Sequence, residues 1–313
     1  MQEIILKDMT PRLSVVIPCY NSINTVGECI SSIQDQTYSK NCYEIIAVDN
    51  GSTDGTCEYL KAKFPMVQLI HSTEKGSGYA RNAGIKEARG EFILSTDADC
   101  VVDKNWMLHL VSAFETASPD VAAVGGQIKP YSSKTAVERY QPAWVSQPDI
   151  NRVQPGVRYA ATPNAAFRAS ALKQVGYFDG SVGHDDTDLG IRLILLGYRI
   201  EFTDAATVQH RNPATLRELY GHRAKYGMRN FSLGRKHPQI LGDPLIPGTR
   251  SKLFLATARR VLGDLIVKQP MAIFAVSGDR PKIWPLIDAT MALGNFSGFY
   301  RAACLARISS RTL

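Results

Sequence analysis

Two aspartates stand one small residue apart at the end of an apolar run, in the stretch "EFILSTDADC". Alternate residues of an extended chain point the same way, so Asp97 and Asp99 can share one ligand while Ala98 keeps out of its path. Because carboxylates are costly to remove from water, we expect a divalent cation or several hydrogen-bond donors beside them. The other interpretation is a solvated turn before a helix over residues 104–116, capped by Asp103.

The elements that would position this pair follow from the periodicity of the sequence. Short runs rich in β-branched residues predict strands, and helical spacing of apolar residues separates the first four of them. The predicted strands are Leu13–Ile17, Tyr43–Val48, Val67–Ile70, Glu91–Thr96 and Val121–Val124, with helices that include 25–36 and 54–64. This alternation predicts an α/β fold with an open, mostly parallel sheet covered by helices.

Polar stretches follow the first four predicted strands: "PCYN", "DNGSTDGT", "KGSGYARN" and "DADC". Ligands of open α/β sheets bind outside the carboxyl ends of the strands, so these stretches are expected to line one crevice. No GxGxxG follows the first strand and no GxxxxGK[ST] occurs, which excludes the usual dinucleotide fingerprint and the P-loop.

The composition is that of a folded protein. The 313 residues are 44% hydrophobic, enough for a core in one large or two modest domains. The amino-terminal sequence lacks the basic and apolar regions of a secretory signal, which predicts a cytoplasmic location. Six cysteines without a CxxC pair are expected to be reduced thiols, mostly buried.

The charge is distributed unevenly along the chain. Residues 211–313 contain 17 Lys+Arg against 5 Asp+Glu, whereas residues 1–210 contain 19 against 24. We therefore predict two domains, 1–210 and 211–313, of which the second is a basic, mainly helical extension. Within it, residues 283–300 are a marginal candidate for a membrane-spanning helix, because Pro285, Gly294 and Gly298 interrupt them.

The basic extension permits two interpretations. Its helices could pack on the first domain with ordinary solvated charges. They could instead form a surface that lies on the anionic inner face of the cell membrane, and we favour this peripheral location. A nucleic-acid partner is not expected, because the arginines alternate with apolar helical positions and no nucleic-acid motif is present.

Five blocks occur in order: "LSVVIPCYNSINTVGECISSIQDQTY", "EIIAVDNGSTDGT", "GSGYARNAGIKEARGEFILSTDAD", "NAAFRASALKQVGYFD" and "DDTDLGIRLILLGYRI". Together they resemble the large bacterial family 2 of nucleotide-sugar glycosyltransferases, which have the GT-A fold, over about residues 12–235. The resemblance implies an inverting, metal-dependent hexosyltransferase of polysaccharide or glycolipid assembly. Its partners would be a nucleotide-sugar donor, a glycan or lipid-linked acceptor hydroxyl, and Mg²⁺ or Mn²⁺.

The resemblance also implies roles for the paired aspartates. Asp99 matches the family's metal-binding aspartate, and Asp97 matches the one that faces the ribose and sugar of the donor. His210 closes "DAATVQH" after a predicted edge strand, where many family members have a histidine that completes the metal site. The alternative for His210 is a structural histidine.

Four residues at the first two strand ends match the part of the family's site that binds the donor. Pro18 ends the first strand and leaves the next backbone groups open to a base, and Tyr20 could pack near the donor or in the core. Asp49 and Asn50 stand where the family usually has two aspartates, one of which recognises the base. Because an amide also donates hydrogen bonds, uridine, thymidine and guanosine donors all stay open.

Two further positions lie in the glycine-rich stretch and beyond it. Gly78 precedes Arg81 at the start of a predicted helix, and such a helix terminus favours an anion. Arg81 could pair with phosphate, or with Asp49 or Asp97. Asn164, in "TPNAAFR", matches a segment under the acceptor pocket, although capping of a turn would explain it as well.

The block "DDTDLGIRL" matches the family's acidic catalytic segment. Asp186 takes the position of the catalytic base, which accepts the proton of the acceptor hydroxyl, and Asp185 takes the place of a glutamate beside it. Asp188 is expected to pair with Arg192 four residues on. An acidic first helical turn is the structural alternative for at least one of these aspartates. A different class of function, a nucleotide-sugar-binding partner subunit without turnover, is the rival of the transferase.

Overall fold

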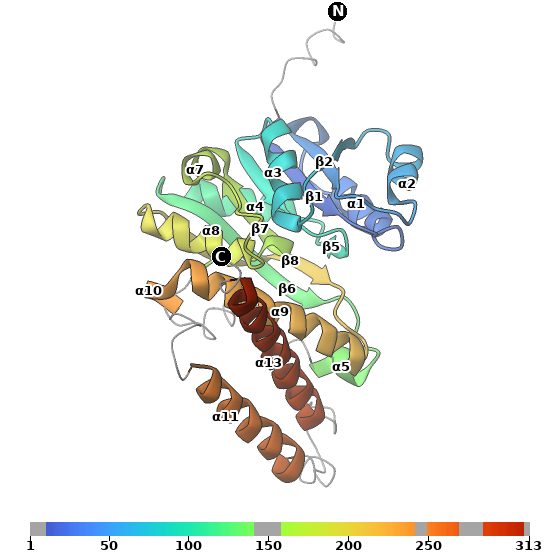
Figure 1. Cartoon of the computed structure of the whole chain (residues 1–313). Coiled ribbons are helices and arrows are strands. Elements are labelled where there is room, and N and C mark those ends of the chain that lie inside the picture. The colour runs from blue at the N-terminus through green and yellow to red at the C-terminus, as the bar shows by residue number, and fades with distance from the viewer. Residues whose placement is uncertain (1–10, 141–157, 242–248, 269–283, 310–313) are drawn as a thin grey trace, which may run out of the picture. The chain divides into compact units, whose positions relative to one another are not determined.

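The computed structural model describes residues 11–140, 158–241, 249–268 and 284–309 (Figure 1). The chain forms two compact units. The first comprises Met1–Tyr131, Trp144–Ser181 and Asp185–Arg211, and the second comprises Ser132–Ala143, Val182–His184 and Asn212–Leu313. The main division thus lies next to the predicted boundary at residue 210, but two short segments from the middle of the chain pack with the second unit. Local sequence patterns carry no signal for such long-range contacts.

The first unit is built on one sheet, which has eight strands within the described residues, in the order β3-β2-β1-β4-β7-β6-β8-β5. The strands are β1 (Leu13–Cys19), β2 (Tyr43–Asp49), β3 (Gln68–His71), β4 (Phe92–Ser95), β5 (Cys100–Val102), β6 (Val121–Pro130), β7 (Ala165–Arg168) and β8 (Arg199–His210). Strands β1 to β4 pair in parallel, as do β6 and β8, while β7 is antiparallel to both of its neighbours. The predicted α/β class with a largely parallel open sheet is confirmed.

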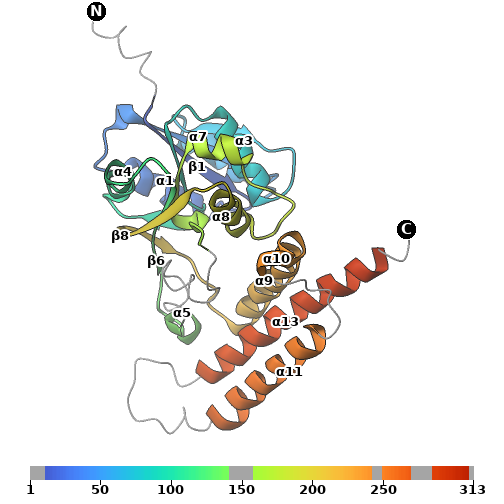
Figure 2. The ribbon, with the colours of Figure 1, turned by 90° about the vertical axis from the view of Figure 1, so that its left-hand side faces the viewer.

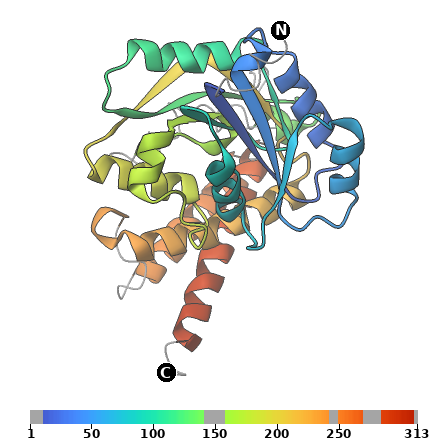
Figure 3. The same cartoon turned by 90° about the horizontal axis from the view of Figure 1, so that it is seen from above.

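Helices cover both faces of this sheet, as Figure 3 shows from above. One core lies between the sheet and α1 (Val26–Gln34), α2 (Thr56–Lys63) and α4 (Trp106–Thr116). The other core lies between the sheet and α3 (Ser77–Glu87), α7 (Ala169–Val175) and α8 (Asp185–Leu195). Successive residues of β1, Val15 and Val16, enter opposite cores, which explains why this strand reads as a continuous apolar run.

Several predicted boundaries shift by one to three residues, and some shifts have a clear cause. Helix α4 begins at Trp106 rather than residue 104, because the Asp103 side chain accepts a hydrogen bond from the Asn105 N–H in the turn before it. Two short 3₁₀ turns, η2 (Lys40–Cys42) and η4 (Thr162–Asn164), introduce β2 and β7. The six cysteines, all within the described residues, are free thiols, and Cys19, Cys29 and Cys100 are buried as expected.

The second unit is helical, as predicted. It contains α5 (Ala136–Tyr140), α9 (Leu216–Lys236), α10 (Pro238–Leu241), α11 (Thr249–Leu262), the π-helical turn η5 (Gly263–Lys268) and α13 (Trp284–Ser309). Figure 2 shows α11 and α13 running side by side. Among the described residues, no helix has the combination of length and apolar character that crossing a membrane requires.

Glycines allow α9 and α13 to pack with their backbones in contact. A Cβ atom at Gly298 of α13 would lie 1.8 Å from the carbonyl oxygen of Ala224 on α9, and one at Gly227 of α9 would lie 2.0 Å from that of Asn295. The glycines that weaken residues 283–300 as a membrane span therefore serve helix packing here. Small residues at such a crossing permit a closer approach than larger side chains allow.

We predict that Gly298→Ala destabilises the protein, because the new methyl group has no space against Ala224. Overpacking of this kind costs about 1–3 kcal/mol, which exceeds the gain in helix propensity of up to about 1 kcal/mol. Gly221→Ala on α9 is the matched control, since a Cβ there meets nothing within 4 Å. It should stabilise the protein slightly. Denaturant unfolding followed by circular dichroism measures both, and equal stabilisation by the two substitutions would contradict the close crossing.

Candidate functional site

The carboxyl ends of the first strands lie at one edge of the sheet. Cys19 of β1 is opposite Asp49 of β2, and Asp49 is opposite His71 of β3. The pairing of β1 with β4 ends earlier, at Val16 and Ser95, so the two strands are no longer joined beyond that point. Pro18 lies in this unpaired stretch, where its missing N–H breaks no bond to β4. The predicted crevice therefore begins between β1 and β4.

Asp49 is buried and strongly held, with 4% of its surface exposed. Its carboxylate accepts hydrogen bonds from the N–H groups of Gly51 and Ser52 at 3.1 Å, and His71 Nδ1 lies 3.6 Å away. Burial alone would raise the pKa of Asp49, but hydrogen bonds from Ser52 and Gly51 outweigh it and lower the pKa. Cys57 contacts the same carboxylate, and burial together with this hydrogen bond raises the pKa of its thiol to about 11.

Asn50 joins the end of β2 to the glycine-rich loop. Its Nδ2 donates to the carbonyl of Glu74 at 2.6 Å, and its Oδ1 accepts from the N–H of Gly76 at 2.7 Å. An aspartate in this position would lack the first of these bonds. The departure from the family's aspartate thus coincides with a structural task. Recognition of a base by Asn50 would have to use the second N–H of Nδ2 or the second lone pair of Oδ1.

Arg81 of α3 connects two acidic segments that are distant in the sequence. Its Nη2 lies 2.7 Å from Asp97 Oδ1, and its Nη1 lies 3.0 Å from Asp185 Oδ2. The Arg81 side chain is only 4% exposed. Burial by itself would lower the pKa of Arg81, but the charges of Asp185, Asp97 and Asp186 raise it. Arg81 therefore stays protonated and pairs with Asp97 rather than Asp49.

Gly78 is the reason that α3 can approach Asp185 so closely. A Cβ at this position would lie 2.7 Å from Asp185 Oδ2 and 3.0 Å from the Cα of Gly180. Ser77 Oγ also lies 3.4 Å from Asp185 Oδ2. The start of α3 is thus packed around a carboxylate, and a direct contact of Gly78 with a substrate stays a prediction.

The acidic start of α8 separates into three environments. Asp185 is buried against Arg81, and its Oδ1 accepts the N–H of Asp186 at 3.1 Å. Asp186 is partly exposed, and its Oδ1 accepts the N–H of Thr187 at 2.7 Å. Asp188 is fully buried and pairs with Arg192 Nε at 2.8 Å, as predicted. Of the three aspartates, Asp186 is the one with appreciable exposure.

Asp99 and His210 come together through strand pairing. Cys100, the first residue of β5, is opposite His210, the last residue of β8, in an antiparallel register. His210 Nε2 thereby lies 3.7 Å from Asp99 Oδ1. Ligand atoms of Asp99, Cys100 and His210 all lie within 4.8 Å of one another, as a metal site requires. Strand β8 lies between β6 and β5 rather than at the predicted edge of the sheet, and β5 supplies this contact.

The surroundings of Asp99 disfavour its negative charge. Burial raises the pKa of Asp99, and the charge of Asp97 raises it further, while His210 acts in the opposite direction. The side chain nevertheless keeps 40% of its surface exposed. A crowded carboxylate that still reaches solvent, beside an imidazole nitrogen, is a fitting position for a cation.

The remaining predicted residues differ in how far they are engaged. Tyr20 is 61% exposed, whereas Ala98 is 6% exposed. Asn164 is buried, with its Nδ2 donating to the carbonyls of Gln127 and Ala206 and its Oδ1 accepting from the Trp106 indole. Asn164 therefore ties η4 to β6, β8 and α4, which favours the structural alternative.

Sequence reasoning missed the second partner of Arg81 and the neighbours of Asp49. The pairing of Arg81 with Asp185 joins α3 to α8, and no spacing rule links residues so distant in the sequence. Phe178 supports the same arginine, with the Arg81 guanidinium carbon 5.8 Å from the centre of its ring. The order of the blocks could have suggested that their polar residues converge, but not which of them pair.

Known proteins resemble this chain in sequence and in fold. The sequence pattern of the family described as glycosyl transferase family 2 matches residues 14–176 of this chain. This range contains the strand ends, Arg81 and the paired aspartates, and ends before α8.

Two curated relatives have activities in their names. Glycosyltransferase AglE of Haloferax volcanii is 32% identical over 199 residues, which are 61% of this chain and 64% of the relative. Poly(ribitol-phosphate) beta-glucosyltransferase of Bacillus spizizenii is 32% identical over 168 residues, 52% of this chain and 26% of the relative. The chain thus spans less than two thirds of the length of these relatives.

A solved structure has the same fold. The mannosyltransferase PcManGT from Pyrobaculum calidifontis, in complex with GDP-Man and Mn²⁺, aligns with a TM-score of 0.66. The alignment covers 94% of this chain and 88% of that chain, at 21% sequence identity. At this identity the likeness establishes the fold alone, and it confirms the predicted GT-A architecture.

We predict that Asn50→Asp destabilises the loop before α3 at neutral pH. The variant's carboxylate would face the Glu74 carbonyl without a proton to donate, and such a loss costs about 1–3 kcal/mol. The repulsion raises the folded-state pKa of the new carboxyl above its unfolded value. The deficit relative to the parent protein should therefore be largest above that folded pKa and shrink as the pH falls through it.

Thermal unfolding of the parent and the variant at pH 7 and pH 5 measures this difference. The Asn41→Asp variant, at an exposed position in η2, is the control for introducing a charge. A pH-independent difference for Asn50→Asp, or none at all, would show that the Asn50 amide does not hold the loop.

Proposed function

Because this chain belongs to glycosyl transferase family 2, we propose that it transfers a sugar from a nucleotide-sugar donor to an acceptor hydroxyl, with inversion at the sugar carbon. The observation that supports this most directly is the arrangement of its carboxylates. Asp97 and Asp99 follow β4, Asp185 and Asp186 begin α8, and Arg81 holds the two groups together. One group is suited to the donor, and the other to the acceptor.

The residues fit a divalent metal ion of the hard type. Asp99 offers a carboxylate oxygen and His210 an imidazole nitrogen, both ligands that Mn²⁺ accepts, and Mg²⁺ would use the carboxylate. When bound, such an ion neutralises charge that develops on the leaving nucleoside diphosphate. The buried thiol of Cys100 is a poor ligand for these ions, and burial raises its pKa well above the ordinary value. Asp99 and His210 would therefore hold the metal.

Asp97 and Arg81 would orient the donor. Arg81 fixes the Asp97 carboxylate through Oδ1, which leaves Oδ2 as an acceptor for sugar or ribose hydroxyls. The neighbouring backbone at the end of β1 and the exposed Tyr20 ring provide a surface for the base. Asp49, Asn50 and Gly78 would support the part of the site that binds the donor. Asn164 would act indirectly, by holding η4, β6, β8 and α4 together.

Asp186 would be the general base. Inversion requires a carboxylate on the face of the sugar opposite the leaving group, close enough to the acceptor hydroxyl to take its proton. The Asp186 carboxylate is oriented through Oδ1 by Thr187 and is partly exposed, whereas Asp185 is buried against Arg81. Asp185 would thus position Arg81 and the start of α8, while Asp186 receives the proton.

The donor and the acceptor are proposed only by class. PcManGT was solved with GDP-Man, and the Bacillus relative acts on poly(ribitol phosphate), as its name states. A role in polysaccharide or glycolipid assembly, with a glycan or lipid-linked acceptor, agrees with both. A nucleotide-sugar-binding subunit without turnover is the second candidate, since the donor half of the site would serve it equally well.

We further propose that the helical unit rests on the anionic inner face of the cell membrane. Residues 211–313 hold 17 Lys+Arg against 5 Asp+Glu. Helix α11 and η5 expose large apolar side chains next to basic ones: Phe254, Leu255, Leu262 and Ile266 are each more than half exposed, and Arg259 and Lys268 are exposed too. Such a mixture suits a membrane surface, where each basic residue contributes about 1 kcal/mol.

We predict different effects for Asp99→Ala and Asp186→Asn. The first should abolish the part of donor binding that depends on Mn²⁺. The second should leave donor binding nearly unchanged and reduce turnover by about 10²–10⁴-fold, as for loss of a general base. Thermal shifts with a panel of nucleotide-sugars, with and without Mn²⁺, measure binding and identify the donor. The exposed Asp204→Asn is the control for removal of a carboxylate.

Equal loss of donor binding in both variants would refute this division of roles. Full turnover by Asp186→Asn would refute its assignment as the base. If the parent protein binds a donor tightly but shows no turnover with any acceptor, and Asp186→Asn changes nothing, the binding-subunit candidate is favoured instead.

We predict that the protein sediments with phosphatidylglycerol vesicles at low salt, binds neutral vesicles poorly and dissociates as salt is raised. Arg259→Glu with Arg301→Glu should weaken this binding, because both side chains are exposed. Arg260 and Lys268 are unsuitable for reversal, since both pair with the buried Asp264. The control pair Lys63→Glu and Lys86→Glu makes the same charge change at exposed positions of the first unit. Indifference to anionic vesicles at low salt would overturn the proposed membrane location.

A further inference from the structure

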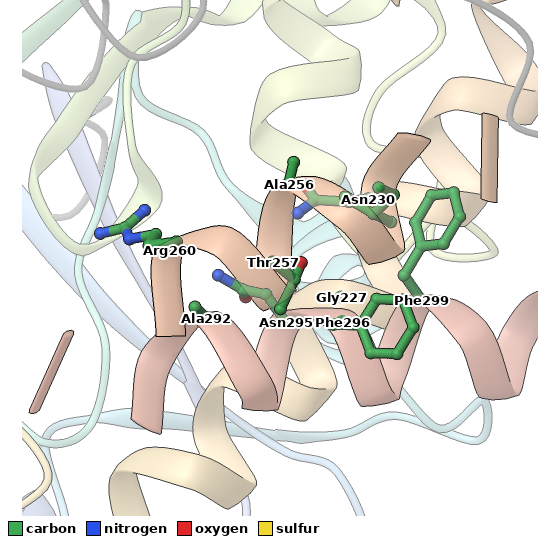
Figure 4. A pocket seen from close by; sticks show the side chains of 10 residues that line it. Gly227, Asn230, Ala256, Thr257, Arg260, Ala292, Asn295, Phe296 and Phe299 are labelled. Carbon is green, nitrogen blue, oxygen red and sulfur yellow. The ribbon is translucent and has the colours of Figure 1, made fainter. Parts of the chain in front are cut away.

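A pocket of about 270 Å³ opens among the three long helices of the second unit. Helix α9 lines it with Gly227 and Asn230, α11 with Ala256, Thr257 and Arg260, and α13 with Asn295, Phe296 and Phe299, among others. Figure 4 shows Arg260 at one end, the rings of Phe296 and Phe299 at the other, and Thr257 and Asn295 between them. The pocket therefore has a cationic side chain at one end and aromatic rings at the other.

The pocket results from the way the helices pack. Glycines bring α9 and α13 into backbone contact, while α11 packs on α13. The space between α9 and α11 is lined by small residues, among them Gly227, Ala256 and Ala292, and no large side chain enters it from these positions. An unfilled apolar space forfeits packing energy, which a fitting apolar ligand restores.

Asn295 is a polar residue in the middle of this pocket. Its Oδ1 is buried and has no hydrogen-bond partner within the described residues. A buried acceptor without a partner is costly, and a rotation of the Asn295 amide toward the pocket would let a ligand hydroxyl remove that cost. The hydroxyl group of Thr257 lies across the same pocket and can donate to a ligand oxygen.

Arg260 lies at the cationic end with its guanidinium half exposed. Asp288 and Asp264 lie 3.5 Å and 3.8 Å from it, which fixes its direction. These two contacts use only some of the five N–H donors of a guanidinium, and the rest can bind an anionic oxygen.

The aromatic end continues to the surface that we propose faces the membrane. The ring centre of Phe296 lies 5.8 Å from that of the exposed Phe254 on α11, and 5.9 Å from that of the exposed Tyr300 on α13. Aromatic side chains are common where proteins meet the interfacial region of a bilayer. The pocket is thus continuous with an apolar, basic surface of the kind that meets lipid.

We propose that this pocket binds one acyl chain of an anionic membrane phospholipid, with the chain against Phe296 and Phe299, a glycerol hydroxyl at Asn295 and the phosphate at Arg260. The proposal rests on the proposed membrane association and assigns it a specific lipid site. A soluble sugar is less suitable, because most of the lining groups form no hydrogen bonds. A volume near the lower limit of ligand pockets suits a single acyl chain rather than two.

Short-chain lysophosphatidylglycerol, used below its micelle concentration, is a suitable probe because it has one acyl chain, a phosphate and free hydroxyls. Calorimetric titration of the full chain should show saturable binding. Glycerophosphoglycerol, which has the same head without the chain, should bind at least tenfold more weakly. Because these ligands are soluble, the titration depends neither on vesicle binding nor on turnover. A negative result would refute the lipid site without refuting the proposed sugar transfer, and loss of sugar transfer would not refute the lipid site.

Ala256→Trp fills the pocket from α11 and should weaken binding of the lipid at least tenfold. Ala258→Trp, two residues along the same helix and outside the lining, is the matched control and should bind as the parent does. Ala292→Met fills the same space from α13 and serves if Ala256→Trp fails to fold. Circular dichroism verifies folding of each variant.

Unchanged binding by folded pocket-filling variants would overturn the proposal, as would equal binding of the head group alone. Preference for a short isoprenyl phosphate over the acyl lipid would also overturn it, by assigning the pocket to a lipid-linked substrate. Binding of oligosaccharide in place of lipid would identify a glycan site.

Discussion

The double ion pair of Arg81 is the interaction on which the site depends. A buried guanidinium with one carboxylate partner from the strand β4 segment and another from helix α8 fixes both elements at once. Removal of one partner from such a network leaves an unpaired buried charge, which costs about 3–5 kcal/mol. The network thus sets the distance between the carboxylates that follow β4 and those that begin α8, and neither group can move without affecting the other. Gly78 is part of the same constraint, because any side chain there would displace Asp185.

Much of this arrangement can be predicted from the sequence, because it depends on residues that are close together in the chain. The strands of the first four βα units carry their own apolar patterns, and the pairing of Asp188 with Arg192 follows from helical spacing. The convergence of the polar stretches follows from parallel pairing, which brings the carboxyl ends of the strands to one edge. These features need only the chain near each residue and the general rules of α/β sheets.

The features that the sequence does not reveal are those created by tertiary contacts. Nothing near Asn50 shows that its amide bridges two backbone groups of a loop, a task beside the base recognition that the family's pattern implies. Nothing near Asn164 shows its three hydrogen bonds to β6, β8 and α4. The antiparallel strand β7, which separates β4 from β6, has only four residues and no distinct pattern. The segments 132–140 and 182–184 join the helical unit through contacts that no local rule anticipates.

The pairing of β5 with β8 has a consequence for how the protein is made. Asp99 lies in the first third of the chain, whereas its neighbour His210 is the last residue of the last strand. Contacts between such distant segments form late, since the closing of a long loop must precede them. During synthesis the first strands and helices can assemble long before His210 leaves the ribosome. A partly made chain therefore has Asp97 and Asp99 without the histidine of β8 and without the carboxylates of α8. The candidate site is therefore complete only after β8 has paired with β5.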